Sequence, residues 1–171
     1  MKPLNKGQLS ILSELSKVYY RIIPRDYLTY CSLTAEISVS VLQHFGIAAH
    51  LVPCQVWLAG PDKNLIVGFT QVKMPGKWDG HVVCVAQDWL IDAATHHFKK
   101  DFGVDVPDLI LARRFPISSS AISRYDLDQN TRLWWLNPPP AADTRLPPSA
   151  SEVVKNMSQM LIRELMTIGP D

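Results

Sequence analysis

The spacing of the apolar residues changes at Gly46, and that change constrains the fold more than any other feature. Before it, residues 8–22 and 31–45 carry apolar side chains every three or four positions, which predicts two helices that each bury one face. After it, residues 47–58 and 65–72 form short, partly alternating apolar runs around a cluster of turn residues, which predicts strands. Helices followed by neighbouring strands favour an α+β fold.

The strand pattern continues through the middle of the chain. We expect further strands at residues 81–85 and 89–92, and a hairpin formed by residues 122–127 and 131–136 around Asp128-Gln129-Asn130. Residues 98–116 fit neither pattern and stay ambiguous. Because the runs are short and closely spaced, the predicted sheet is antiparallel.

A proline-rich stretch at residues 137–148 holds five of the thirteen prolines and predicts an extended, semi-rigid connector. It separates a domain over residues 1–136 from an amphipathic C-terminal helix over residues 149–171, where Ser149 and Glu152 have capping-box spacing. The apolar stripe of that helix must be buried against the first helix, against the sheet, or against a second copy of the chain or a partner protein.

Composition excludes several classes of function. The chain has 171 residues, 47% of them hydrophobic, which is enough to bury a core without a disulfide or a metal. Its 17 basic and 16 acidic residues leave no broad basic face, so we expect no nucleic-acid partner. Residues 1–10 lack the apolar run of a signal peptide, and no stretch approaches the roughly 18 apolar residues of a membrane helix. We therefore expect a cytoplasmic protein with no membrane partner.

Three cysteines form an odd set without a Cys-x-x-Cys spacing, which is typical of reduced thiols. Cys54 and Cys84 lie inside apolar strand patterns and are expected to be inert core residues. Cys31 would open the second predicted helix, where free amide hydrogens and the positive end of the helix dipole favour a thiolate. Cys31 is therefore the candidate nucleophile.

A base and an orienting carboxylate are predicted on two neighbouring strands. If a two-residue loop at residues 86–87 joins them, His81 and Asp92 are directly opposed, with Cβ atoms roughly 4.5–5.5 Å apart. A four-residue loop over residues 85–88 keeps this register, whereas a three-residue loop would turn the two side chains to opposite faces. We predict that Cys31, His81 and Asp92 meet as nucleophile, base and orienting residue.

Other polar residues are given lesser roles. The amide of Cys31 could hold an oxyanion, with Gln55 or Tyr30 as a weak candidate for a second donor. We expect no metal and no cofactor, because the adjacent histidines 96–97 would point to opposite faces of a strand. The arginines 113–114 are expected to form a solvated pair, although they could clamp a carboxylate, and the tryptophans 134–135 should place one ring inside the core.

The order of these residues is informative as a whole. A cysteine run at residues 31–35, a glycine turn into a strand at residues 45–52, and the runs 81–83 and 89–94 with His81 and Asp92 resemble the transglutaminase-like core of the papain-like cysteine superfamily. Its triad is shared with arylamine N-acetyltransferases. The resemblance covers roughly residues 30–94 and implies a papain-like α+β fold, with Cys31 as nucleophile, His81 as base and Asp92 as orienting residue.

Two functions of different classes follow. The first is an acyl transferase or hydrolase that attacks an amide, ester or thioester of a small molecule, peptide or protein through a thioester on Cys31. The alternative is a catalytically silent transglutaminase-like module that binds or scaffolds, with the C-terminal helix as its docking element.

Overall fold

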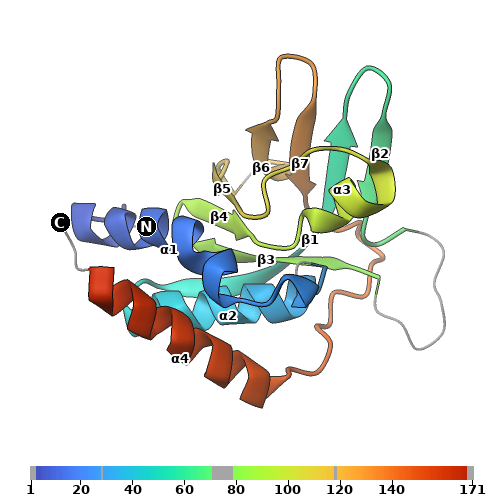
Figure 1. Ribbon diagram of the computed structural model, residues 1–171. Coiled ribbons are helices and arrows are strands. Elements are labelled where there is room, and N and C mark those ends of the chain that lie inside the picture. The colour runs from blue at the N-terminus through green and yellow to red at the C-terminus, as the bar shows by residue number, and fades with distance from the viewer. Residues whose placement is uncertain (1–2, 28, 71–78, 118, 169–171) are drawn as a thin grey trace.

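The structure is a computed structural model that describes residues 3–27, 29–70, 79–117 and 119–168. Within these residues the fold is α+β, as the change in apolar spacing predicts: four α-helices accompany a seven-stranded antiparallel sheet. Helices α1 (Lys6–Ile22), α2 (Cys31–His44) and α4 (Ser151–Ile168) gather on one side of the sheet, whereas α3 (His96–Phe102) lies apart from them (Figure 1).

Local sequence signals explain where the first two helices begin and end. Asn5 and Gln8 form a reciprocal capping box at the start of α1, and Pro24 follows its last turn. A short 3₁₀ helix, η1 (Arg25–Tyr27), leads to α2. Gly46 takes a left-handed φ of 69° just after α2, so the predicted cap is confirmed.

The strands are β1 (Ala49–Ala59), β2 (Asn64–Val67), β3 (His81–Ala86), β4 (Trp89–Asp92), β5 (Ile110–Arg113), β6 (Ala121–Asp126) and β7 (Arg132–Leu136). Their order is β5-β4-β3-β1-β7-β6, with β2 also paired to β1. The long strand β1 pairs with β3 through residues 49–54 and with β7 through residues 55–59. An isolated bridge between Arg114 and Ser123 brings the two ends together, so the sheet is nearly closed.

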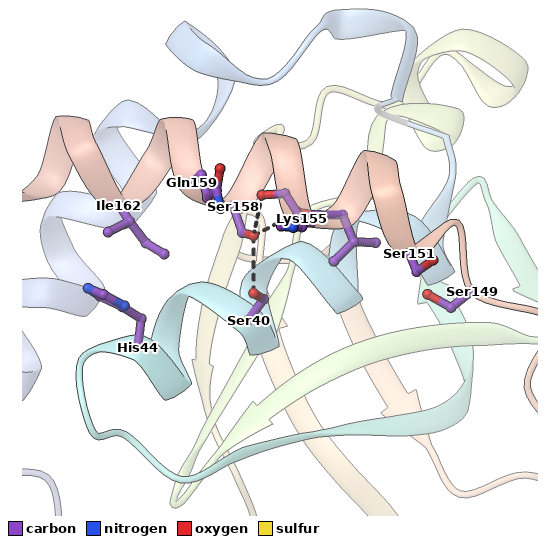
Figure 2. Close-up of a pocket in the computed structure, with 9 residues that line it drawn as sticks. Ser40, His44, Ser149, Ser151, Lys155, Ser158, Gln159 and Ile162 are labelled. Carbon is purple, nitrogen blue, oxygen red and sulfur yellow. Dashed lines mark hydrogen bonds between the residues drawn. The ribbon is translucent and has the colours of Figure 1, made fainter.

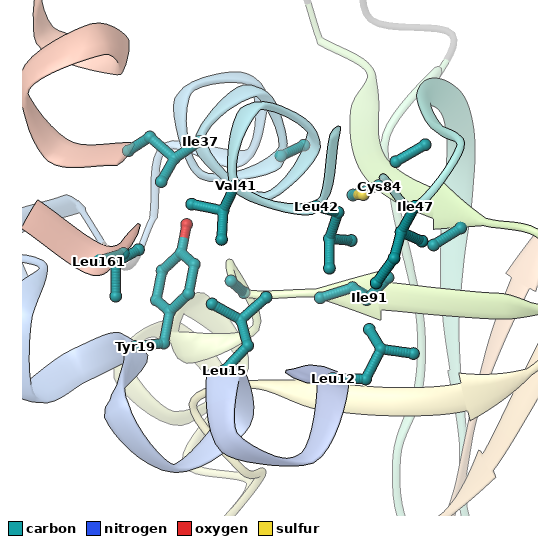
Figure 3. Close-up of a cluster of buried hydrophobic side chains, with 14 of the residues drawn as sticks. Leu12, Leu15, Tyr19, Ile37, Val41, Leu42, Ile47, Cys84, Ile91 and Leu161 are labelled. Carbon is teal, nitrogen blue, oxygen red and sulfur yellow. The ribbon is translucent and has the colours of Figure 1, made fainter. Parts of the chain in front are cut away.

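Strand β3 is buried along its whole length because both of its faces pack. Val82, Cys84 and Ala86 face the core under α1, α2 and α4, where Figure 3 shows Tyr19, Val41 and Leu161 converging with others. His81, Val83 and Val85 face a second core inside the curved sheet. The continuous apolar run of β3 therefore reflects burial on two sides rather than one.

The C-terminal helix completes the first of these cores. Leu161 and Leu165 of α4 are buried among residues of α1 and α2, which answers the question left open by its apolar stripe. The predicted capping box is wrong: α4 begins at Ser151, and the Ser149 hydroxyl instead donates to the Glu36 carboxylate on α2. The structure, which describes all of residues 137–148, places no helix or strand in this connector.

Two expected segments differ from the prediction. The second strand ends at Val67 rather than at residue 72, because Gly68 and Phe69 both take positive φ angles. Residues 71 and 72 of that prediction lie outside the described residues. The ambiguous stretch 98–116 supplies the end of α3 and strand β5. Among the described residues, no helix has the length and apolar content to cross a membrane.

The packing of α4 predicts a large stability difference between two neighbouring residues. Leu161→Ala removes a fully buried side chain and should lower the free energy of unfolding by about 2–5 kcal/mol. Met160→Ala, at a position that is 45% exposed, should change it by less than about 1 kcal/mol. Equilibrium urea unfolding measures both variants, and equal small losses would show that α4 is not part of the core.

Candidate active site

The centre of the candidate site is a contact between His81 of β3 and Asp92 of β4. The His81 Nε2 lies 2.8 Å from the Asp92 Oδ2, and the two side chains are only 3% and 1% exposed. A charged pair with so little water needs close geometry and further hydrogen bonds to be stable. The predicted meeting of these two residues is therefore realised in the core, not at the surface.

The register that produces this contact differs from the predicted one. Ala86 pairs with Trp89, so the loop is residues 87–88 and the pairing is displaced by two positions. The left-handed φ of Gln87, 57°, places the turn one residue later than expected. His81 and Asp92 are therefore not directly opposed, but a shift of two keeps both on one face, where a long side chain reaches a diagonal neighbour.

Several donors hold the Asp92 carboxylate in its ionised form. The Ala94 amide donates to Oδ1 at 3.0 Å, and the indole of Trp135 on β7 donates to Oδ2 at 2.7 Å. Burial alone would raise the pKa of Asp92, but the charge of His81 and these hydrogen bonds hold it below its usual value. Trp135 is the inner ring expected of the pair 134–135, and its bond to the carboxylate is a role that sequence reasoning missed.

The segment after β4 is anchored from the helical side. The Tyr20 hydroxyl of α1 donates to the Ala93 carbonyl, and the next residue, Ala94, holds Asp92. A second hydrogen bond, from the Tyr19 hydroxyl to the Thr34 carbonyl at 2.7 Å, ties α1 to the first turn of α2. Helix α1 thus positions both the carboxylate and the helix that carries the cysteine.

Cys31 is the first residue of α2 and reaches the site past the beginning of β3. Its Sγ lies 3.9 Å from the Gly80 carbonyl and also receives hydrogen bonds from the His81 ring and the Val82 amide. Burial by itself would raise the pKa of this thiol, but the His81 and Val82 contacts lower it below its usual value. The structure therefore brings all three predicted residues together.

His81 is the charged centre of the group. Burial would lower the pKa of this imidazole, but the Asp92 carboxylate and the Cys31 sulfur raise it to about 10. Since Nε2 faces Asp92, Nδ1 is the ring nitrogen left for Cys31. The lowered pKa of Cys31 and the raised pKa of His81 both favour a thiolate beside an imidazolium.

Gly68 is a positioning residue that sequence reasoning missed. With its φ of 87°, it lets the chain after β2 pass the backbone of His81 closely: a Cβ at this position would lie 2.9 Å from the His81 nitrogen and 3.2 Å from the Cys54 carbonyl oxygen. Any side chain here would displace the strand end that carries His81. In the sequence, a single glycine after a short strand does not indicate such a close approach of two backbone segments.

The site opens into a pocket of about 390 Å³. Its lining comes from the start of α2 and the segment before it, the start of β3, the end of β2 and helix α3, namely Thr29, Cys31, Val67, Gly80, His81, His97, Lys100, Asp101 and Phe102. Histidines 96–97 lie in the first turn of α3. The prediction that they point to opposite faces of a strand is therefore wrong. Among the described residues, no group of three or more His, Cys, Asp or Glu side chains could hold a metal ion.

The other polar residues and cysteines considered in the sequence analysis lie away from the pocket or are bonded to other groups. The Gln55 amide donates to the Gly68 carbonyl at 3.0 Å, and the Tyr30 side chain is exposed. Arg113 pairs with Asp88 and lies over the Trp89 ring, far along the sheet from the pocket. Cys54 and Cys84 are buried, and burial raises the pKa of both thiols, as expected of inert residues.

A second pocket of about 460 Å³ lies between α2 and α4 (Figure 2). Ser40 donates to Ser158 at 3.1 Å across the helix contact, and Lys155 and His44 border the opening. The serine hydroxyls satisfy one another and the helix backbone, since Ser158 donates to the Val154 carbonyl. Among its described lining residues no nucleophile contacts a base, unlike Cys31 and His81 in the first pocket.

Comparison with known proteins adds little. No family model matches the chain, and no curated protein matches it. The crystal structure of a genomics target is similar with a TM-score of 0.42 and 14% sequence identity, over 94% of this chain and 79% of that chain. At this level the similarity carries no conclusion about fold family or activity.

The buried His81–Asp92 pair predicts that loss of the Asp92 carboxylate lowers the free energy of unfolding by an amount that depends on pH. Asp92→Asn should lower the free energy of unfolding by about 3–5 kcal/mol, because it leaves His81 buried without its counter-charge. The raised pKa of His81 stabilises the fold fully below about pH 6.5 and loses that effect as pH rises toward 10, and the lowered pKa of Asp92 loses its effect at acid pH. The deficit should therefore be largest from about pH 4 to 6.5.

Urea unfolding at several pH values measures this deficit. Asp88→Asn on the same hairpin is the matched control: its pair with Arg113 is partly exposed and should be worth less than about 1 kcal/mol at every pH. A deficit of equal size in both variants would show that the buried pair has no special weight.

Thiol alkylation tests the lowered pKa of Cys31. With iodoacetamide at pH 6, Cys31 should react at least about tenfold faster than Cys54 or Cys84, because its pKa is lowered whereas burial raises the pKa of the other two thiols. His81→Ala should remove most of this advantage, whereas His44→Ala, in the other pocket, should leave it intact. Peptide mass spectrometry gives the three rates, and equal rates in the unaltered chain would contradict the assignment.

Proposed function

We propose that this protein is a cysteine-dependent acyl transferase or hydrolase that acts on an amide, ester or thioester. The observation that supports this most is the continuous chain of contacts from the Cys31 sulfur to the His81 ring and on to Asp92, open to a pocket at its sulfur end. A structural cysteine would not need a buried imidazolium beside it.

In the proposed reaction the Cys31 thiolate attacks the acyl carbon of the donor and forms a carbon–sulfur bond. The His81 imidazolium gives its proton to the leaving group, which departs as an amine, alcohol or thiol and leaves a thioester on Cys31. Water or another nucleophile then attacks the thioester, neutral His81 takes the proton, and the thiolate is released. Asp92 stays ionised throughout and stabilises the charged ring.

The beginning of α2 supports the developing negative charge. The first amides of a helix have no partner within the helix, and Cys31 is the first residue of α2. The Cys31 amide is therefore a candidate donor to the oxyanion, aided by the positive end of the helix dipole. The same helix end favours the thiolate before reaction.

We further propose that the fold is a papain-like core of the transglutaminase type. Its support is the arrangement itself: a cysteine at the start of a helix, with its histidine and aspartate on neighbouring antiparallel strands and in contact. The helical layer over one face of the sheet agrees with this assignment.

The pocket narrows the kind of acyl group that fits. A volume of about 390 Å³ is at the small end for a ligand site, so it suits a small molecule, a single side chain or a chain end. Lys100 and Asp101 bring both signs of charge to its rim, and Phe102 and Val67 bring apolar surface. Because the apolar stripe of α4 packs within the chain, the alternative of a silent module that docks through this helix has less support.

An acylation experiment tests the proposal. With p-nitrophenyl acetate the protein should release a burst of about one nitrophenolate per chain and carry one acetyl group on the peptide that contains Cys31. Cys31→Ala should show neither, with Cys54 and Cys84 still present as internal controls. Absence of both burst and acetylation in the unaltered chain would favour the silent binding module.

A further inference from the structure

His97 is a half-buried polar residue in the Cys31 pocket that the proposed triad does not use. It lies in the first turn of α3, and its ring centroid is 5.9 Å from that of His81. Its Nε2 is shielded from solvent and has no hydrogen-bond partner among the described residues. A shielded nitrogen without a partner costs stability unless a ligand or a bound water satisfies it.

The other ring nitrogen determines what Nε2 can do. The His97 Nδ1 lies 2.7 Å from the Ala94 carbonyl oxygen, which can only accept, so Nδ1 carries the proton. In a neutral ring Nε2 is then an acceptor with a free lone pair. Burial and the nearby charge of His81 both lower the pKa of His97, which keeps the ring neutral.

One residue, Ala94, connects His97 to the triad. The Ala94 amide donates to Asp92, and the carbonyl of the same residue receives the His97 proton. The acceptor nitrogen of His97 is therefore held in a fixed relation to the His81–Asp92 pair, and both histidines line the same pocket.

We propose that the His97 Nε2 orients the nucleophile that resolves the acyl intermediate, by accepting a hydrogen bond from it while His81 takes its reacting proton. This inference rests on the proposed acyl chemistry of Cys31. For water, one hydrogen passes to neutral His81 and the other points at His97 as the oxygen bonds to the acyl carbon. The carbon–sulfur bond then breaks, the sulfur leaves as a thiolate, and the product acid loses its remaining proton to solvent.

Two substitutions separate this role from a structural one. His97→Asn places an amide NH₂ where Nδ1 was, so it can keep the bond to Ala94 but offers no acceptor at Nε2. His97→Gln reaches to the Nε2 position, where its carbonyl oxygen can accept, but loses the Nδ1 donor. A purely structural histidine would be replaced better by asparagine, whereas an orienting acceptor would be replaced better by glutamine.

The experiment follows p-nitrophenyl acetate in single and multiple turnovers. His97→Asn should keep the burst rate and the iodoacetamide reactivity of Cys31 within about twofold, but slow release of the acetyl group by about 10- to 100-fold. His97→Gln should recover part of that loss. Circular dichroism spectra should match those of the unaltered chain.

The outcomes are distinguishable. If the unaltered chain forms no acetyl-Cys31, the proposed function fails and this inference fails with it. If acetyl-Cys31 forms and His97→Asn releases the acetyl group as fast as the unaltered chain, only the role of His97 is overturned. A loss in both burst and release, with glutamine worse than asparagine, would assign His97 a structural role and also overturn it.

Discussion

A histidine and an aspartate that meet where water does not reach can coexist only if their charges are balanced and their remaining polar atoms are bonded. The contact between His81 and Asp92 meets this requirement through donors from Trp135 and the Ala94 amide. Much of the surrounding structure follows from it. Strand β7 contributes the indole, and α1 fixes the chain after β4 through the Tyr20 hydroxyl. The polar centre and the apolar core are thus built by the same elements.

The charge held in this way lowers the pKa of the sulfur, on which the proposed reaction depends. A carboxylate at one nitrogen of the ring keeps the imidazole protonated, and the imidazolium with the helix start lowers the pKa of Cys31. Cys31 belongs to α2, on the helical side of the sheet, whereas the His81 ring faces the other side. The two side chains therefore meet only at the end of the sheet where β3 begins. Because Gly68 has no side chain, the chain after β2 passes close to His81 without displacing the start of β3. A second histidine on α3 then faces the same space.

The hairpin between β3 and β4 shows how far reasoning along the chain reaches. A two-residue loop was the right expectation, and so was a shared face for His81 and Asp92, yet the loop lies one residue later. The contact survives because parity, not direct opposition, decides which side chains share a face. His97 shows the opposite outcome. From the sequence a strand is expected there, but His97 lies in α3, whose N-cap residue Thr95 donates its hydroxyl to the Pro107 carbonyl instead of capping the helix.

Periodicity and composition alone were enough for the first two helices, the antiparallel strands, the buried stripe of α4 and the place of Cys31 at a helix start, because each depends on residues close together in the chain. The partners of Asp92, the two-sided burial of β3, the cover of α4 and the place of His97 depend on which distant segments pack together. Such contacts depend on how the whole chain buries its apolar surface and pairs its buried polar groups. A pattern of neighbouring residues does not contain that information.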